Sequence, residues 1–366
     1  MLCLPVKGWR LVLHGTFNHL NYIPSEMKTI RTITLLFITA SLVFVQCKKE
    51  IDNPYDPATP GALWTPVSFS ANQTGTTVVL SWLQEATPVS GFKIDRKVAP
   101  GDWKNIASVG EEVLSYTDTD LAGPKLHEYR IYAVAGNNQS DMTFTEITPV
   151  FPDGTTRALT YHGDTYRTVW INNREWMAVS LSTSKYRDGS SIATGLTNTQ
   201  WQNTNAGAFA IFPHAEIADL TSVDGVLKAY GALYNWYAID DSRGLCPPGW
   251  HVPSRADWDE LVDYAGTAVN AGGKLKSVRT VPGPHPRWES PNTGATDEYG
   301  FSAVPSGGRG YDGTYSGLGY FTFFWTSTSF NVDNAWARLL VANSVQTGSG
   351  DVDKNLGLSV RCLRDQ

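Results

Sequence analysis

Apolar and polar residues alternate in short runs along the chain between residues 63 and 150. The alternating runs are residues 77–82, 92–97, 103–109, 116–118 and 129–135. Alternation of period two is typical of a strand with one buried face, and turn-forming residues separate these runs. The pattern predicts an all-β sandwich over residues 63–150, with Val78, Leu80 and Trp82 facing its core.

The alternation returns in residues 161–192, where it predicts two or three short strands around a turn at Asn172-Asn173. A Gly-rich loop region lies farther along the chain, before strand-like runs at residues 323–329 and 334–342. The last run, residues 356–365, predicts a terminal strand that carries Cys362.

Two helices are predicted between these strands. An aromatic segment beginning at Tyr230 is expected to be helical, and a Pro/Gly corner with Cys246 follows it. The second helix should begin after Ser254, which can cap the first-turn amides, while Asp257 suits the positive end of the helix dipole. Its residues at i, i+3, i+4 and i+7 form one apolar stripe of Trp258, Leu261, Val262 and Ala265. Gly266 then offers a left-handed cap.

The N-terminal segment has the pattern of an export signal. Lys28 and Arg31 precede an apolar run at residues 33–45, which is the length of a signal-peptide core and too short to span a bilayer. Cys47 follows in a segment that resembles a bacterial lipoprotein box, in which this cysteine becomes lipidated and is the mature first residue. Gln46 departs from the usual small residue, but relaxed boxes of this kind resemble those of Bacteroidota lipoproteins.

We therefore expect a leader at residues 1–46 with its true start at Met27, and an extended Pro-rich tether at residues 47–62. The protein would be an outer-membrane lipoprotein, facing the cell surface or the periplasm, with the membrane as a partner through its lipid. The alternative is an ordinary secreted protein in which Cys47 is unmodified.

Composition and charge narrow the class of partner. Aromatic residues make up 12% of the chain, which has 13 Trp and 33 Gly but only 17% charged residues, and this suits aromatic-packed β domains outside the cell. Loss of the leader removes four cationic groups and one acidic group, so the net charge changes from −6 to about −9. Such a surface repels phosphate backbones, and no nucleic-acid partner is expected.

The first domain contains the segments GFKIDRK and DLAGPKLHEYRIYAVAGNNQS. They resemble strand C, the E-F corner and strand F of a fibronectin type III module, an immunoglobulin-like sandwich. The resemblance implies a tyrosine corner formed by Leu121 and Tyr129. It also implies that the module acts as a spacer more often than as a binding domain.

The second half contains, in order, VWINNREWMAVSL, YGALYNW, GLCPPGWHVPSRADWDEL, AGGKLKS, DEYGFSAVPSGGRG, FFWTSTS and SVRCLRD. In this order they resemble the Fibrobacter succinogenes major paralogous domain, or FISUMP domain, which we place at residues 151–366. That family is in turn similar to the C-type lectin-like fold. The resemblance implies an α+β domain that joins two helices to a small twisted antiparallel sheet whose terminal strands pair.

The cysteines fit this assignment. With Cys47 lipidated and Cys3 outside the mature protein, Cys246 and Cys362 are the pair left in an oxidising compartment. We expect a disulfide that joins the helical corner to the last strand, as the long-range bridge of lectin-like folds does. The alternative is two separate free thiols.

The sequence offers no clear catalytic or metal-binding motif. The calcium-binding triplets of lectin-like domains are missing, and residues 351–355 resemble the start of an EF-hand loop but are better explained as a hairpin turn. His251, beside Trp250, is expected to be a packed or turn histidine rather than a base. We therefore expect no metal, no cofactor and no enzymatic activity.

Tyrosines and glycines alternate in the loop region at residues 283–322, and tyrosines on a glycine-rich backbone can offer broad contact surface. The candidate ligand-binding residues are Arg309, Tyr311, Asp312, Tyr315 and Tyr320. The favoured function is non-catalytic recognition of a glycan or protein ligand. One alternative is a structural subunit of a cell-surface or adhesin-like assembly, and a weaker one is an enzyme of unknown class.

Overall fold

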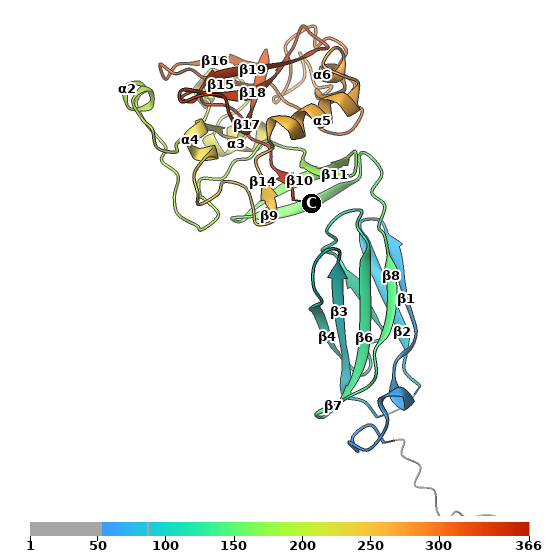
Figure 1. Ribbon diagram of the computed structural model, residues 1–366. Coiled ribbons are helices and arrows are strands. Elements are labelled where there is room, and N and C mark those ends of the chain that lie inside the picture. The colour runs from blue at the N-terminus through green and yellow to red at the C-terminus, as the bar shows by residue number, and fades with distance from the viewer. Residues whose placement is uncertain (1–52, 86–87, 366) are drawn as a thin grey trace, which may run out of the picture. The chain divides into compact units, whose positions relative to one another are not determined.

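The computed structural model describes residues 53–85 and 88–365 (Figure 1). The leader and residues 47–52 of the tether, with Cys47, lie outside the described residues, so export and lipidation stay predictions. In the described part of the tether, residues 54–59 form turns, and Asp56 and Thr59 donate backbone hydrogen bonds to Asn53 and Asp56. Within the described ranges, no helix combines the length and apolar character needed to cross a membrane.

The first domain is an all-β sandwich, as predicted. One sheet has the strand order β1-β2-β5, formed by β1 (Val67–Thr74), β2 (Thr77–Leu83) and β5 (Ser115–Asp118). The other has the order β4-β3-β6-β7, formed by β4 (Lys104–Gly110), β3 (Gly91–Val98), β6 (His127–Ala135) and β7 (Asn138–Gln139), and β8 (Thr143–Ile147) also pairs with β6. The sequence analysis missed β1, β7 and β8, and no residue of these three strands is fully buried.

The sandwich core contains the residues that the alternation placed there. Val78, Leu80 and Trp82 are buried, and the Trp82 ring packs edge-on against Phe92 with centroids 5.4 Å apart. Tyr129 is also fully buried, but its hydroxyl donates to the carboxylate of Asp118 at 2.8 Å. The tyrosine is therefore anchored through a side chain at the end of β5.

The second domain begins with a five-stranded sheet of order β14-β20-β11-β10-β9. Its strands are β9 (Thr156–Tyr161), β10 (Asp164–Ile171), β11 (Arg174–Met177), β14 (Trp250–His251) and β20 (Leu363–Arg364). Asn172 and Asn173 join β10 to β11 with φ of 50° and 59°, so the predicted turn is confirmed. The domain's last strand, β20, lies between β14 and β11, while its first strand, β9, is an edge strand that pairs with β10. The terminal strands therefore do not pair with each other, in contrast to what the lectin-like resemblance implied.

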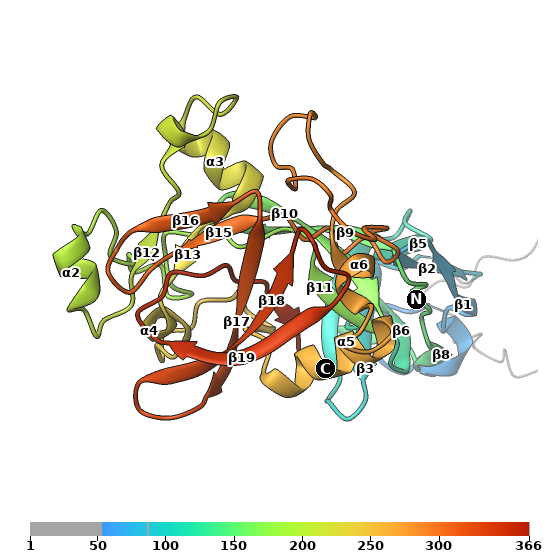
Figure 2. The same ribbon diagram turned by 90° about the horizontal axis from the view of Figure 1, so that it is seen from above.

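A second five-stranded sheet has the order β16-β15-β17-β18-β19 (Figure 2). Its strands are β15 (Ser306–Arg309), β16 (Tyr315–Leu318), β17 (Phe321–Ser329), β18 (Asn334–Val341) and β19 (Thr347–Asp353). β15 runs parallel to β17, and the other neighbours are antiparallel. A separate short ladder joins β12 (Phe209–Ala210) to β13 (Leu233–Tyr234).

Short helices connect these sheets. The helical segments of the described chain are η1 (Gly61–Trp64), α2 (Asn198–Gln202), η2 (His214–Glu216), α3 (Val223–Tyr230), α4 (Trp236–Ile239), α5 (Arg255–Ala265) and α6 (Ala271–Leu275). α5 agrees with its prediction: Ser254 and Asp257 form a capping box, Gly266 follows with φ of 120°, and the predicted apolar stripe is buried. It packs against β17 through Trp258 and Phe324, whose rings stack with centroids 5.3 Å apart.

The prediction of one aromatic helix beginning at Tyr230 was correct only for Trp236–Ile239, which form α4. Tyr230 ends α3, and Gly231 breaks the helix with φ of 78°. Tyr234 lies in a strand because its backbone exchanges hydrogen bonds with Leu358, and its carbonyl also accepts from the Trp325 indole at 2.7 Å. Tertiary backbone pairing therefore outweighs the local helical tendency of this segment.

Candidate functional site

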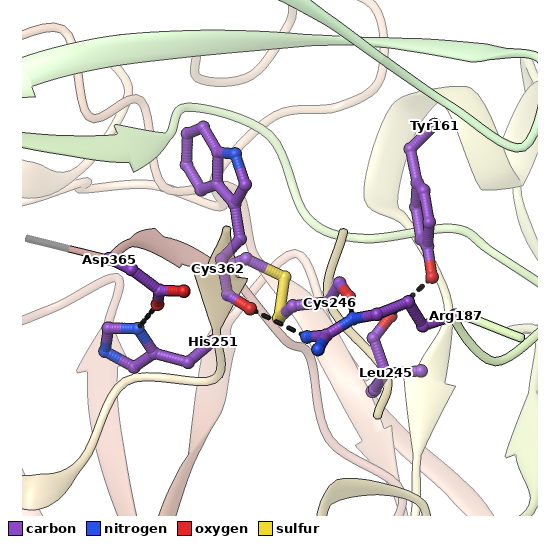
Figure 3. The surroundings of a disulfide bond; sticks show 8 residues. Tyr161, Arg187, Leu245, Cys246, His251, Cys362 and Asp365 are labelled. Atoms are coloured by element: carbon purple, nitrogen blue, oxygen red, sulfur yellow. Dashed lines mark hydrogen bonds and ion pairs between the residues drawn. A yellow bond between two sulfur atoms is a disulfide. The ribbon is translucent and has the colours of Figure 1, made fainter. Parts of the chain in front are cut away.

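The helical corner is fixed from several sides (Figure 3). Cys246 and Cys362 form a disulfide with Cα atoms 5.9 Å apart, so the expected pairing is confirmed. Arg187 donates through Nε to the Cys246 carbonyl and through Nη2 to the Trp250 carbonyl, both at 2.9 Å. The Arg187 guanidinium and these two carbonyl oxygens therefore stabilise the corner by bonding to each other.

His251 lies at the surface of this corner and is half-exposed. Its Nδ1 is 2.6 Å from Asp365 Oδ1, and its Nε2 is 3.5 Å from Asp257 Oδ2. Hydrogen bonding to these two carboxylates raises the pKa of His251, which favours the imidazolium over the neutral ring that a base requires. Trp250 is buried, and so is Trp258, as the apolar stripe of α5 predicted.

Part of the predicted binding loop at residues 283–322 is the hairpin β15–β16, and Tyr320 lies beyond this hairpin, in the turn before β17. Arg309 is buried, and its guanidinium stacks over the Trp201 ring at 4.4 Å. The same group donates to the carbonyl oxygens of Gly313 and Leu196, each at 2.9 Å. Arg309 thus holds the hairpin to the segment around α2, and its donors face protein groups.

The other candidate residues differ in exposure. Tyr311 and Tyr320 are 57% and 42% exposed. Asp312 is exposed, but its Oδ1 accepts from the amide and the hydroxyl of Thr314, which lowers the pKa of the carboxyl and forms the hairpin turn. Tyr315 is half-buried, and its ring packs edge-on against Phe212 at 5.4 Å. The structure does not gather these five side chains at one hollow.

A cleft of about 420 Å³ lies elsewhere in the same domain, and α3 and the loop after α6 contribute to its walls. Strand β10 contributes Arg167 to the cleft, and Ala178 follows the end of β11. The end of α3 contributes Lys228, and the loop after α6 contributes Arg279. Arg361, next to the disulfide, also lines it. Segments that are far apart in sequence therefore build this cleft.

One acidic side chain, Asp297, lines the cleft among the described residues. Both of its carboxylate oxygens are occupied: Oδ1 accepts from the Ser302 amide at 2.6 Å and Oδ2 from the Ser302 hydroxyl at 2.5 Å. The Ser302 hydroxyl in turn accepts from Arg167 Nη2 at 2.8 Å. This network orders one wall of the cleft. The lining therefore has an excess of positive charge, with four cationic side chains and one carboxylate.

Arg361 lies beneath this wall and is fully buried. Its guanidinium packs 4.1 Å from the centroid of the Phe301 ring and donates to the carbonyl oxygens of Phe301, Met177 and Ser302. Burial lowers the pKa of Arg361 to about 9, so the group stays charged at neutral pH. In the sequence, Arg361 lies between the apolar residues Val360 and Cys362. A charged residue within an apolar strand-like run is the signal that could have indicated this site.

A second hollow of about 400 Å³ is lined by Tyr186, Tyr237 and Asp241 among others. Its arginine, Arg243, is paired with Asp241 at 2.7 Å. No cluster of three His, Cys, Asp or Glu side chains suited to a metal occurs within residues 53–85 and 88–365. In the EF-hand-like stretch, Asp351 to Asp353 belong to β19 and the two following residues form a turn.

Residues 169–364 match the model of the Fibrobacter succinogenes major domain family. The chain belongs to this family. The match confirms the FISUMP resemblance, and it includes Cys246, Cys362 and Arg361.

Comparison of structures finds fibronectin modules. The crystal structure of FN3tt is 24% identical, with a TM-score of 0.21, and the match covers 23% of this chain and 90% of that one. An Fn3-like protein from Clostridium thermocellum is 22% identical, with a TM-score of 0.21, over 24% of this chain and 95% of that one. No curated protein matches the chain. The assignment of the sandwich rests on its own strand pairing.

Proposed function

We propose that this FISUMP protein is a lipid-anchored cell-envelope protein whose C-terminal domain recognises a glycan or protein ligand without chemical turnover. The signal pattern and Cys47 support export and anchoring. The Cys246–Cys362 disulfide supports an oxidising compartment outside the cytoplasm. The sandwich would serve as a spacer between the anchor and the binding domain, and a C-type lectin-like ancestry of that domain is part of the proposal.

The cleft walled by β10, α3 and the loop after α6 carries the proposal. Its volume of about 420 Å³ lies within the range of sites for small ligands and chain ends. Hydrolysis by paired carboxylates needs two acidic groups, whereas Asp297 is the acidic side chain that lines this cleft in the described chain. Because Ser302 already binds both Asp297 oxygens, the carboxylate orders the wall and is poorly placed to act as a base.

A binding experiment with a cleft-filling variant tests the proposal. Full-length protein carrying Cys47→Ser, made without its lipid, is applied to a panel of neutral and acidic glycans and envelope proteins. Val278 lines the cleft and is exposed, so Val278→Trp should fill the space and weaken binding without unfolding the domain. Val269→Trp, at an exposed position outside the cleft, is the matched control and should bind normally. Equal binding by both variants would contradict the proposal.

Two exposed rings, Tyr311 in the β15–β16 hairpin and Tyr320 in the turn before β17, favour assembly as a second candidate function. Tyr311 and Tyr320 expose much of their aromatic rings to solvent. Large exposed apolar surface is uncommon on monomeric proteins and is typical of interfaces. Light scattering during size exclusion distinguishes the two functions. Oligomers that dissociate on Tyr311→Ala and Tyr320→Ala, with no panel binding, would favour the structural role.

A further inference from the structure

We infer that the cleft binds an oxyanion, a carboxylate or a sulfate, carried by a saccharide, and that Arg167 and Arg279 contact it. This inference rests on the proposed function and names the class of ligand. Its first support is a contrast of charge. The chain has 29 cationic and 35 acidic side chains, yet four cationic side chains and one acidic side chain line this cleft. A cationic cleft on an acidic protein concentrates anionic ligands at that place.

The pairing of these cations identifies the ones free to bind. Lys228 forms an exposed ion pair with Asp224 at 2.8 Å, so part of its charge is neutralised. The Arg167 guanidinium makes one hydrogen bond within the described part of the chain, to the neutral hydroxyl of Ser302. The exposed Arg279 guanidinium has no acceptor among the residues that the structure describes. Arginine presents several donors in a planar fork that matches carboxylate and sulfate oxygens.

Arg361 adds a fixed charge behind these two residues. Backbone carbonyl oxygens hold its guanidinium, and no carboxylate in the described ranges accepts a hydrogen bond from it. Its Nε has no partner among the described residues. A buried charge without a bonded counter-ion is costly, and a bound anion in the adjacent cleft reduces that cost.

The remaining lining favours a saccharide over a peptide. Ser180, Ser277 and Ser302 contribute hydroxyl groups, and the Ser277 hydroxyl is buried without a hydrogen-bond partner among the described residues. Val278, Pro286 and Val304 add apolar surface beside these hydroxyl groups. A sugar ring with one anionic group matches this mixture, because it presents hydroxyl groups at its edge and C–H groups on its face.

The test uses the full chain with Cys47→Ser and four probes at equal concentration in titration calorimetry. These are an oligosaccharide of galacturonic acid, a sulfated oligogalactose, an uncharged oligogalactose of the same length and an oligoglutamate peptide. We expect both acidic saccharides to bind at least about 10-fold more tightly than the uncharged one, because a hydrogen bond between an arginine and an anionic oxygen is stronger than one to a neutral hydroxyl. Added salt should weaken that binding.

Two variants locate the contact. Arg279→Gln and Arg167→Gln should each weaken binding of the acidic saccharides about 10-fold and leave the circular dichroism spectrum and melting temperature unchanged. Arg255→Gln makes the same change of charge on the exposed face of α5, outside the cleft, and should leave affinity unchanged. Equal weakening by all three variants would show general electrostatic attraction and overturn the assignment.

Further outcomes separate this inference from the proposed function. If charged and uncharged oligosaccharides bound equally well and Val278→Trp blocked both, the claim of oxyanion recognition would be contradicted. The claim that the cleft binds a saccharide would stand. If oligoglutamate, or inorganic sulfate alone, bound tightly and Arg279→Gln weakened that binding, the claim that a saccharide carries the anion would be contradicted. Failure of both acidic saccharides to bind at millimolar concentration would overturn the inference, and the glycan and protein panel then decides the proposed function independently.

Discussion

The disulfide between Cys246 and Cys362 joins the corner before α5 to the segment that enters β20, across a sequence separation of 116 residues. β20 lies between β14 and β11, so this bond connects the helical corner to the centre of the first sheet of the domain. Val360 and Arg361 precede Cys362 in the same segment, and Arg361 lines the cleft. The corner and the cleft are thus built on one short stretch of chain.

Reduction of this disulfide should destabilise the second domain. Opening a loop of 116 residues removes about 4 to 5 kcal/mol of stabilisation in the loop-entropy account. Urea unfolding followed by tryptophan fluorescence, with and without reductant, measures the difference. The double variant Cys246→Ala/Cys362→Ala should show the lower stability under both conditions, and a further loss on adding reductant to it would mean that another bond is involved.

Lys276 should be far more important for stability than its neighbour Lys274. The buried Lys276 ammonium donates to the carbonyl oxygens of Thr293, Val341, Ala342 and Ser344 at 2.9 to 3.3 Å. Burial lowers the pKa of Lys276 to about 8, but the side chain is still charged at pH 7.

Lys276→Met leaves these carbonyl groups without a donor and should cost about 3 kcal/mol of unfolding free energy. Lys274 pairs with Glu298 at the surface, so Lys274→Met should cost less than about 1 kcal/mol. Chemical denaturation measures both values. Similar losses in the two variants would contradict the role assigned to the buried ammonium.

Arg309 should support the hairpin and not a ligand. Arg309→Met removes the donors to Gly313 and Leu196 and should lower the unfolding free energy by about 2 kcal/mol. Arg255, which stacks on Trp336 at 3.6 Å but is exposed, is the matched control, and Arg255→Met should change stability by less than about 1 kcal/mol. Loss of ligand binding in Arg309→Met at unchanged melting temperature would instead assign this residue to recognition.

The pH dependence of stability should contain a contribution from His251. Hydrogen bonding to Asp257 and Asp365 raises its pKa above the ordinary value of 6.5, so the folded state binds the proton more tightly than the unfolded chain. The stabilisation is complete below pH 6.5 and is lost as the pH rises through the raised pKa of the folded state.

Melting temperatures from pH 5.5 to 9 for the native protein and for His251→Gln test this expectation. The difference between the two curves should be largest at low pH and shrink above pH 6.5. Asp365→Asn, which removes one of the two acceptors, should reduce the same difference. A difference that grows with pH would contradict the assignment.

Local sequence patterns determined much of the fold. Alternation located the inward face of β2, because a strand with one buried side must repeat every two residues. The capping box at Ser254, the stripe from Trp258 and the Gly266 cap located α5, because each depends on neighbours along the chain. The pairing of Cys246 with Cys362 followed from the family resemblance and the cysteine count, and the structure confirms it.

Tertiary structure alone decided the rest. Tyr234 is in a strand because Leu358, distant in sequence, supplies its backbone partners. Arg309 and Arg361 could not be distinguished by sequence pattern. In the structure, Arg309 holds the β15–β16 hairpin, whereas Arg361 lies under the cleft. The cleft joins Arg167, Arg279 and Arg361, and no local period relates such distant positions. Their proximity results from packing of sheets and loops around two cores, which is a property of the folded chain and not of any single segment.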